Sequence, residues 1–479
     1  MIKRIFSLAL VMATAAAFIP YVVAGELEDA KPEVSFYAMQ RMRYESMNNY
    51  FDANDNINDR LDFWTSRTLV GMKTMLARDV WSKVELQHVG SFGNQTPQRS
   101  DVYSFAGPVF QNWDRNQTFN GAKQNEVELY RAEVGMDKIG GSNFSVALGR
   151  QEYTVGNNLI FGNEPFYNGT VFDGLTGSYQ FKSWKLTGIY FVTQERQDVA
   201  SSNPAFGNFN PVPGNEDQKV GGFDGYLTLN DGENDNWGDI QPYIYYFKDG
   251  NRDFSLHLEE TVYGAWWGRH AKTVEKVKAN PMNWGIEIAV EDGSELKNPG
   301  TNATDSFTGW IAEGNFGWNF LSHDRIIHRP EVGFIMTPGD DNLTNSDGIG
   351  WSEKFGDIHC RFGCADFFEA SPSNFFAGIT ATWVGYTIMT NPGRHMGYVK
   401  YWDFKPTEDM IKTSTTGPKT HVYDYGTELD LGYSYGYTAN VKLFATVAQF
   451  MPDRGVTGSA SAPQDTIERI YGGLWLKFH

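Results

Sequence analysis

The chain has 479 residues, of which 15% are aromatic and 50 are glycine, and its 58 acidic and 40 basic residues give a net charge of −18. The aromatic content excludes a disordered acidic chain, and a mean hydropathy of −0.44 excludes a bundle of membrane-spanning helices. Two cysteines exclude a disulfide-rich scaffold, and the negative charge argues against a nucleic-acid-binding protein, which needs a basic surface.

The N-terminus has the features of a secretory signal peptide. Lys3 and Arg4 precede a short apolar run, and small residues then stand at the −3 and −1 positions of a cleavage point before Gly25. The alternative is an uncleaved N-terminal anchor, although the apolar run is short for a membrane span. We expect residues 1–24 to be removed and residues 25–479 to form the mature protein, whose net charge is −20 because two basic residues are lost.

From residue 34 onward, apolar side chains recur at every second position. Between positions 80 and 86, for example, Val80, Val84 and Leu86 fall on one parity and charged residues fall on the other. A period of two with one apolar and one polar face predicts β-strands. The pattern predicts eighteen strands, at about 34–46, 63–76, 80–90, 126–137, 144–152, 174–181, 184–195, 222–230, 239–248, 260–269, 282–292, 307–319, 330–338, 374–389, 396–404, 422–435, 440–451 and 466–478.

The connections between these strands alternate between short and long. The exception is 270–281, which falls on the short end and could hold a helix over 271–279. An even number of strands with this rhythm is typical of an all-β fold, the antiparallel transmembrane β-barrel, with short periplasmic turns and long extracellular loops. The alternative is a soluble β-protein whose aromatic residues form its core. We therefore expect a barrel in the cell outer membrane, surrounded by outer-membrane lipid and lipopolysaccharide.

The C-terminal strand supports this prediction. Residues 471–478 alternate and end on the aromatic Phe478, one position before the terminus. Outer-membrane barrels commonly carry such a final strand, which the barrel-assembly machinery recognises, and His479 is a small departure from the pattern. The assembly machinery is therefore an expected partner.

The inward parity of the predicted barrel carries both signs of charge. Arginine is a strong ligand for carboxylates because its planar fork binds two oxygens and stays protonated. A line of arginines could pass a polyanion from site to site, if each site binds weakly enough to release it. The alternative is an ordinary solvated pore lining, whose charges pair across neighbouring strands.

Several stretches resemble the alginate export family of outer-membrane porins, whose founding member is an 18-stranded barrel. The first strand contains Arg41-Met42-Arg43-Tyr44-Glu45, which is similar to the Arg-x-Arg-x-Glu start of the family. The other similar stretches are Gly149-Arg150-Gln151, Phe172-Asp173-Gly174, Gly339-Asp340-Asp341, 426–430 and Phe450-Met451-Pro452. Together they follow the order of the family over nearly the whole mature chain.

The resemblance implies export of an anionic polysaccharide through an arginine-lined constriction, together with periplasmic export partners. The expected pore-lining cations are Arg41, Arg43, Arg67, Arg131 and Arg150. The expected pore-lining acids are Glu133, Asp173, Glu428 and Asp430. The chain departs from the family in having about as many inward carboxylates as cations. Two other functions stay open, a general diffusion porin for small solutes and the barrel sheath of a porin–cytochrome conduit.

Other chemistry has little support in the sequence. Cys360 and Cys364 are separated by three residues, which fits neither a redox nor a haem motif, so we expect a small disulfide loop. The acidic stretches 52–59 and 231–239 lack the glycine and final glutamate of a calcium loop. No hydrolase, zinc-protease or phosphate-loop motif is present. We expect no enzymatic activity, no cofactor, no metal and no nucleic-acid partner.

Overall fold

The computed structural model describes most of the chain after the predicted cleavage point. The described ranges are 32–49, 60–92, 127–163, 165–166, 169–194, 216–229, 237–250, 257–270, 273–296, 304–323, 325–339, 351, 354–357, 359–368, 378–390, 393–408, 410–412, 420–422, 424–453 and 465–478. The predicted signal peptide and the acidic stretch 52–59 lie outside these ranges.

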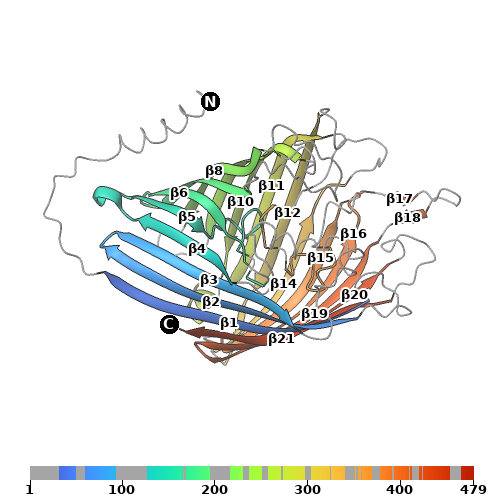
Figure 1. Ribbon diagram of the computed structural model, residues 1–479. Coiled ribbons are helices and arrows are strands. Elements are labelled where there is room, and N and C mark those ends of the chain that lie inside the picture. The colour runs from blue at the N-terminus through green and yellow to red at the C-terminus, as the bar shows by residue number, and fades with distance from the viewer. Residues whose placement is uncertain are drawn as a thin grey trace, which may run out of the picture.

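Nineteen strands form one sheet that makes up the wall of the molecule (Figure 1). They are β1 (Glu33–Asn48), β2 (Leu61–Ala77), β3 (Val80–Phe92), β4 (Val127–Met136), β5 (Phe144–Gln151), β6 (Phe172–Gln180), β7 (Trp184–Gln194), β8 (Glu216–Thr228), β9 (Asp239–Gly250), β10 (His257–Arg269), β11 (Met282–Leu296), β12 (Thr304–Trp318), β13 (Phe320–Ser322), β14 (Ile326–Met336), β15 (Thr380–Thr390), β16 (His395–Lys405), β19 (Gly426–Thr438), β20 (Val441–Pro452) and β21 (Ile467–Phe478). Because β13 continues β12 after Asn319 and both pair with β14, the wall has eighteen strands. The prediction of an all-β barrel of about 18 strands is confirmed.

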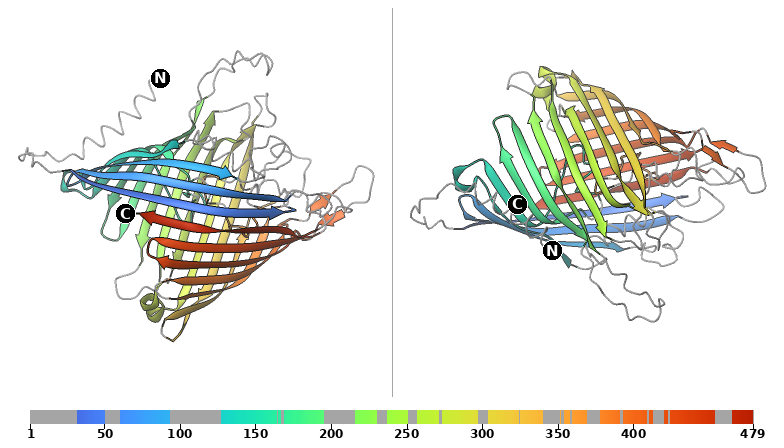
Figure 2. Two further views of the ribbon diagram at one scale, coloured as in Figure 1. Left: turned by 60° about the horizontal axis from the view of Figure 1, so that its bottom comes forward. Right: turned by 90° about the horizontal axis from the view of Figure 1, so that it is seen from above.

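The sheet closes on itself through its first and last strands. β1 pairs antiparallel with β2 on one side and with β21 on the other, so that Arg41 lies opposite both Arg67 and Trp475. Figure 2 shows the closure, with blue β1 beside red β21. A closed sheet leaves no unpaired strand edge, which is required of a β-structure in lipid.

The two ends of the barrel differ in their connections. At one end, which we call the short-turn end, residues 78–79 join β2 to β3 and residues 439–440 join β19 to β20. At the opposite end, residues 337–379 separate β14 from β15, and the small hairpin of β17 (Met410–Lys412) and β18 (Thr420–Val422) lies there (Figure 1). The assignment of the short-turn end to the periplasm stays a prediction.

The two faces of the wall follow the alternation of the sequence. Val70, Leu148 and Val384 point outward, and more than half of each side chain is exposed. Such an apolar outer belt is the surface that a membrane covers. Charged residues of the opposite parity, such as Arg43 and Glu428, point inward and are fully buried.

A β-bulge in β4 alters this alternation at Tyr130. Arg131 pairs with Glu85 and Leu129 pairs with Leu86, so Tyr130 is an extra residue without a partner on β3. The bulge turns both Tyr130 and Arg131 to the inner face, because the extra residue breaks the period of two. The sequence pattern alone assigns Tyr130 to the outer, apolar parity, and this assignment is wrong.

The short helix expected over 271–279 is present as α4 (Val274–Ala279). Thr273 caps its N-terminus by accepting a hydrogen bond from the backbone N–H of Lys276. At the other end, the buried Arg269 donates to the carbonyl oxygens of Lys276 and Asn280. Among the described residues, no helix is long and apolar enough to cross a membrane.

Candidate functional site

Two segments from the end opposite the short turns fold into the barrel and pair with each other. They are the described parts of 152–171 and 351–368, which together we call the plug. Phe161 and Phe355 form a parallel β-bridge, in which Gly162 donates to the carbonyl of Phe355 at 2.8 Å and Phe355 donates to that of Ile160 at 3.0 Å. Arg361 of the second segment also donates to two carbonyls of the first. The two segments therefore form one unit.

An aromatic cluster attaches the plug to the inner face of β6, β7 and β9. The Phe161 ring lies 5.3 Å from that of Phe172 and 4.9 Å from that of Tyr245, both in edge-to-face geometry. Phe161 and Phe191 are completely buried. Burying a side chain of this size contributes roughly 1.5–3 kcal/mol. This part of the inner face is apolar, whereas the sequence suggested a polar lining throughout.

The arginines of β1 and β2 hold the first segment of the plug by its backbone. Arg41 and Arg67 donate to the carbonyl of Pro165, the latter at 3.3 Å, and Arg43 donates to that of Phe166. The guanidinium of Arg43 also lies 3.6 Å from the centre of the Phe166 ring. The three arginines are at most 3% exposed. Their donors therefore face the plug rather than an open bore.

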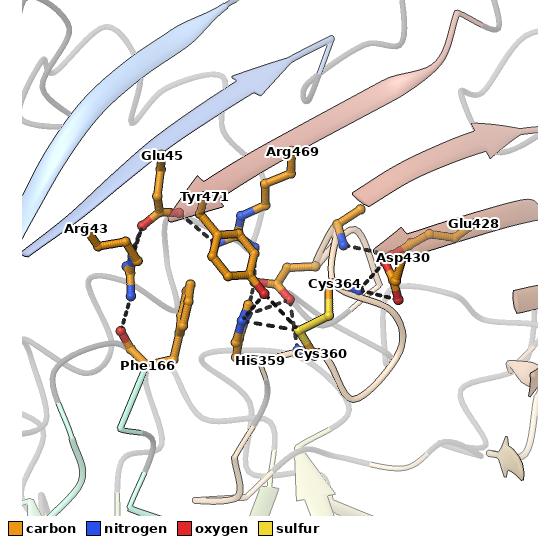
Figure 3. A network of polar contacts seen from close by, with 12 residues as sticks. Arg43, Glu45, Phe166, His359, Cys360, Cys364, Glu428, Asp430, Arg469 and Tyr471 are labelled. Atoms are coloured by element: carbon orange, nitrogen blue, oxygen red, sulfur yellow. Dashed lines mark hydrogen bonds and ion pairs between the residues drawn. A yellow bond between two sulfur atoms is a disulfide. The ribbon is translucent and has the colours of Figure 1, made fainter. Parts of the chain in front are cut away.

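Carboxylates balance this arginine cluster. Glu45 accepts from Arg43 at 2.7 Å and from Arg469 of β21 at 2.9 Å (Figure 3). Arg469 also forms an ion pair with Asp366 of the plug. All of these groups are buried, so removing one member of an ion pair would leave its partner as an uncompensated buried charge. The free energy of folding would then become less favourable by about 3–5 kcal/mol.

His359 lies at the centre of the network in Figure 3. Its ring stacks on Phe166 with 3.3 Å between ring centres, and its two nitrogens contact Asp366 at 2.8 Å and the hydroxyl of Tyr471 at 2.9 Å. Burial, and then the positive charge of Arg469, hold the pKa of His359 well below its usual value. The imidazole is therefore neutral at neutral pH.

Two acids of β19 hold the second segment of the plug. The backbone N–H of Ala365 donates to Glu428 at 2.8 Å, and that of Cys364 contacts both oxygens of Asp430 at 3.3 Å (Figure 3). Neither acid is exposed. Cys364 is joined to Cys360 by a disulfide, which closes a small loop in this segment. The wall acids thus bind plug amides, just as the wall arginines bind plug carbonyls.

His359, Cys360 and Asp366 have potential metal-ligand atoms within 4.8 Å of one another. The sulfur of Cys360 is engaged in the disulfide, and the carboxylate of Asp366 is paired with Arg469. A cysteine binds a metal ion only as a free thiolate, and an adjacent cation repels the ion. This group of residues therefore does not suit a metal ion.

Arg131 and Glu133 lie on the inner face of β4. Arg131 forms ion pairs with Glu152 at 2.7 Å and with Glu85 at 3.7 Å, and it donates to Glu133 at 3.0 Å. Glu152 belongs to the plug. The side chain of Arg131 is 15% exposed, more than the arginines beneath the plug.

Arg150 and Asp173 were expected to line the pore, but the structure places them on the outer side of the wall. They pair across β5 and β6 and form a bidentate ion pair with both distances at 2.7 Å. Their strand neighbours Gln151 and Phe172 are buried inside, so the alternation turns Arg150 and Asp173 outward, together with Leu148. The sequence motifs match a family pattern but do not give the side of the wall on which each residue lies.

Acidic residues of β11 and β12 also bind the plug. Glu287 of β11 accepts a hydrogen bond from the backbone N–H of Asn157 at 2.7 Å. Glu313 of β12 accepts one from the side-chain amide of Asn157 at 2.8 Å. Glu313 also pairs with Arg361. Gly156 has a φ of 58°, in the left-handed region that favours glycine, and a Cβ there would force the Glu287 carboxylate to shift.

Lys354 inserts a buried cation between two wall acids. Its ammonium lies 2.7 Å from both Glu260 and Glu291. Burial alone would lower the pKa of Lys354, but the two carboxylates raise it above its ordinary value. Lys354 is therefore charged, and it fixes the second segment of the plug to β10 and β11.

A cavity of about 300 Å³ remains between the plug and the inner face of β10 to β16. Lys400 lines it, and its ammonium lies 4.3 Å from the centre of the Trp383 ring. The main side chains of its lining are Trp266, Trp383, Trp402, His270, Glu287, Glu313, Glu331, Asp357, Arg361 and Lys400. The cavity thus offers flat aromatic surfaces together with hydrogen-bonding groups of both charges.

Several of these residues were not among the sites expected from the sequence. Arg469 shares the inward parity of Tyr471 on the final strand, so the strand pattern could have identified it. Lys354 and Arg361 belong to a long connection without periodicity. Their roles depend on contacts between segments far apart in the chain, which a single sequence does not reveal.

The comparisons with known proteins concern the fold. No protein-family model matches the sequence, and no curated protein matches it. Solved structures do resemble the barrel. The TM-score is 0.56 at 10% identity for the outer membrane protein OpdK of Pseudomonas aeruginosa, 0.53 at 12% for OccK9 (OpdG) of the same organism, and 0.54 at 12% for OccAB2 of Acinetobacter baumannii. Each comparison covers 93% of this chain and 98% of the other.

These neighbours, which include an outer membrane protein, support the closed β-barrel fold, and that fold agrees with the expected location in the outer membrane. They do not single out the alginate export family. OpdK has been solved with vanillate, and OccK2 (OpdF) of P. aeruginosa in complex with glucuronate. Identities of 8–12% carry the likeness of fold and no more.

Proposed function

We propose that the protein is an outer-membrane diffusion channel for small polar solutes, among them small carboxylates. The observation that carries this proposal is the plug, which is anchored to the wall on several sides and leaves a cavity of about 300 Å³ beside it. That volume is at the lower end of the range for small-molecule sites. A polysaccharide chain would need a continuous bore.

The chemistry of the cavity suits a small acid with an attached ring. Lys400 supplies a cation for a carboxylate, and Trp383 and Trp402 supply flat apolar faces. Glu331 can accept hydrogen bonds from solute hydroxyls. Vanillate and glucuronate, found with the structural neighbours, are acids of this size and kind.

This proposal takes the place of polysaccharide export, which the sequence resemblance favoured. The arginines that were expected to bind a passing polyanion instead bind carbonyl oxygens of the plug. A cytochrome inserted into the barrel would have to displace the same plug and its buried ion pairs. A small-solute channel needs neither change.

Liposome swelling tests the proposal. Liposomes containing the purified full chain should take up glucuronate and vanillate, whereas uronate oligomers of ten or more units should remain outside. Lys400→Gln should slow carboxylate uptake about ten-fold relative to a neutral monosaccharide, the effect of losing one hydrogen bond to a charged group. Uptake of the oligomers at the rate of the monomer would contradict the proposal.

A further inference from the structure

The outer wall carries an apolar groove near the short-turn end. It has a volume of about 470 Å³ and spans four strands, from β15 to β20. Two cross-strand rows of outward residues form it, namely Ile388, Gly397, Tyr433 and Ala445 in one and Tyr386, Val399, Leu431 and Val447 in the other. The groove exists because Gly397 and Ala445 stand where the surrounding belt carries larger side chains.

The space above Gly397, at the floor of the groove, is not occupied by neighbouring side chains. A Cβ built on Gly397 would meet no atom closer than 3.7 Å. A larger side chain at this position would therefore project into the groove without disturbing the wall. This makes Gly397 a suitable position for testing what occupies the groove.

Two tyrosines form the sides of the groove, and each is fixed by a histidine. The hydroxyl of Tyr386 contacts His328 at 2.7 Å, and that of Tyr433 contacts His395 at 2.7 Å. Because their polar ends are engaged, the tyrosines present carbon atoms to the groove. Tyrosines at this height are typical of the boundary between the lipid tails and the headgroups.

The rim next to the groove is positively charged. Arg394 lies in the turn between β15 and β16, where its guanidinium donates to the hydroxyl of Tyr435 at 3.2 Å and lies 5.6 Å from the ring centre. Arg325 lies exposed in the neighbouring turn between β13 and β14. The described residues of these turns include no acid, and Asp324 lies outside the described ranges.

We propose that this groove binds an anionic phospholipid, with an acyl chain along the groove and the phosphate at Arg394. An apolar slot below a cationic rim matches a lipid with a negative headgroup, and each basic residue near such a surface contributes to its binding. A second copy of this chain fits less well, because a two-fold contact through this face would bring the cationic rims together. The proposal depends on the membrane location and is independent of the transported solute.

Native mass spectrometry of the full chain in detergent tests the proposal, with phosphatidylglycerol and phosphatidylcholine as probes. The wild type should bind one phosphatidylglycerol in preference to phosphatidylcholine. Gly397→Leu should weaken this binding at least ten-fold by filling the groove, and Arg394→Gln should weaken it about five-fold by removing one phosphate contact. Ala132→Leu, on the outer face of β4, is the matched control and should bind as the wild type does.

Equal binding of phosphatidylglycerol by wild type and Gly397→Leu would overturn the proposal. A dimer that Gly397→Leu abolishes would overturn it in favour of a second copy of the chain. Single-channel conductance of all three variants should equal that of the wild type, since none of the substitutions reaches the lumen. This readout separates failure of the lipid site from failure of the proposed channel function.

Discussion

Substituting Phe161 by alanine would test whether aromatic packing keeps the plug inside the barrel. The Phe161 ring is completely buried and packs edge-to-face on Phe172 and Tyr245. Removing a buried phenylalanine ring costs about 3–5 kcal/mol. Since the ring joins plug to wall, most of this cost falls on the docked state of the plug. At 1.4 kcal/mol per factor of ten, the ratio of docked to undocked plug should fall at least 100-fold.

Single-channel recording in planar bilayers would measure this effect. The Phe161→Ala protein should show frequent transitions to a larger conductance, and liposomes containing it should admit uronate oligomers that the wild type excludes. Phe223→Ala is the matched control, because Phe223 is 58% exposed on the outer wall. Heat-modifiable migration on gels would verify that both variants form closed barrels. Wild-type conductance and size cut-off in a correctly closed Phe161→Ala barrel would refute the reasoning.

Three further predictions concern the charges and the disulfide around the plug. The disulfide between Cys360 and Cys364 closes a very short loop, so its reduction should destabilise the second segment of the plug by about 2 kcal/mol and increase the fluctuations of the channel current. A variant with serine at both positions should show the same effect without reductant. Arg131→Gln should shift the reversal potential toward cations, whereas Arg150→Gln, on the outer face, should leave it unchanged; equal shifts would contradict this placement. Because the pKa of His359 is lowered in the docked plug, an undocked plug binds more protons below about pH 6.5, so the open fraction should rise as the pH falls through that value. His359→Gln should remove this pH dependence, and a wild type insensitive to pH from 7.5 to 5.5 would exclude the role of His359.

The architecture of the wall was accessible from the sequence because strand periodicity is a local property. A period of two marks each strand whatever its neighbours are, and the even strand number with its alternating connections then indicates a closed barrel. The helix at Val274–Ala279 was accessible for the same reason. The period fails where one residue is inserted, and the bulge at Tyr130 is such a place.

The candidate site was only partly predictable from the sequence. The sequence identified Arg43, Arg67 and Glu428 as inward-facing, but the groups that they bind are backbone atoms of segments more than 60 residues away. Backbone carbonyls and amides occur in every residue and leave no signal in a sequence. The placement of Arg150 failed because a motif resemblance was used where strand pairing decides the side.

The parallel bridge between Phe161 and Phe355 also has a consequence for assembly. The two halves of the plug are separated by almost 200 residues, and the backbone bridge between them forms only once the second half has arrived. Contacts of such long sequence separation form late, because the entropy of closing the intervening chain must be overcome first. We therefore expect the strand hairpins to form early and the lumen to fill near the end of folding. A barrel arrested before its last strands join would be leaky, so closure of the wall and restriction of its permeability would be separate events.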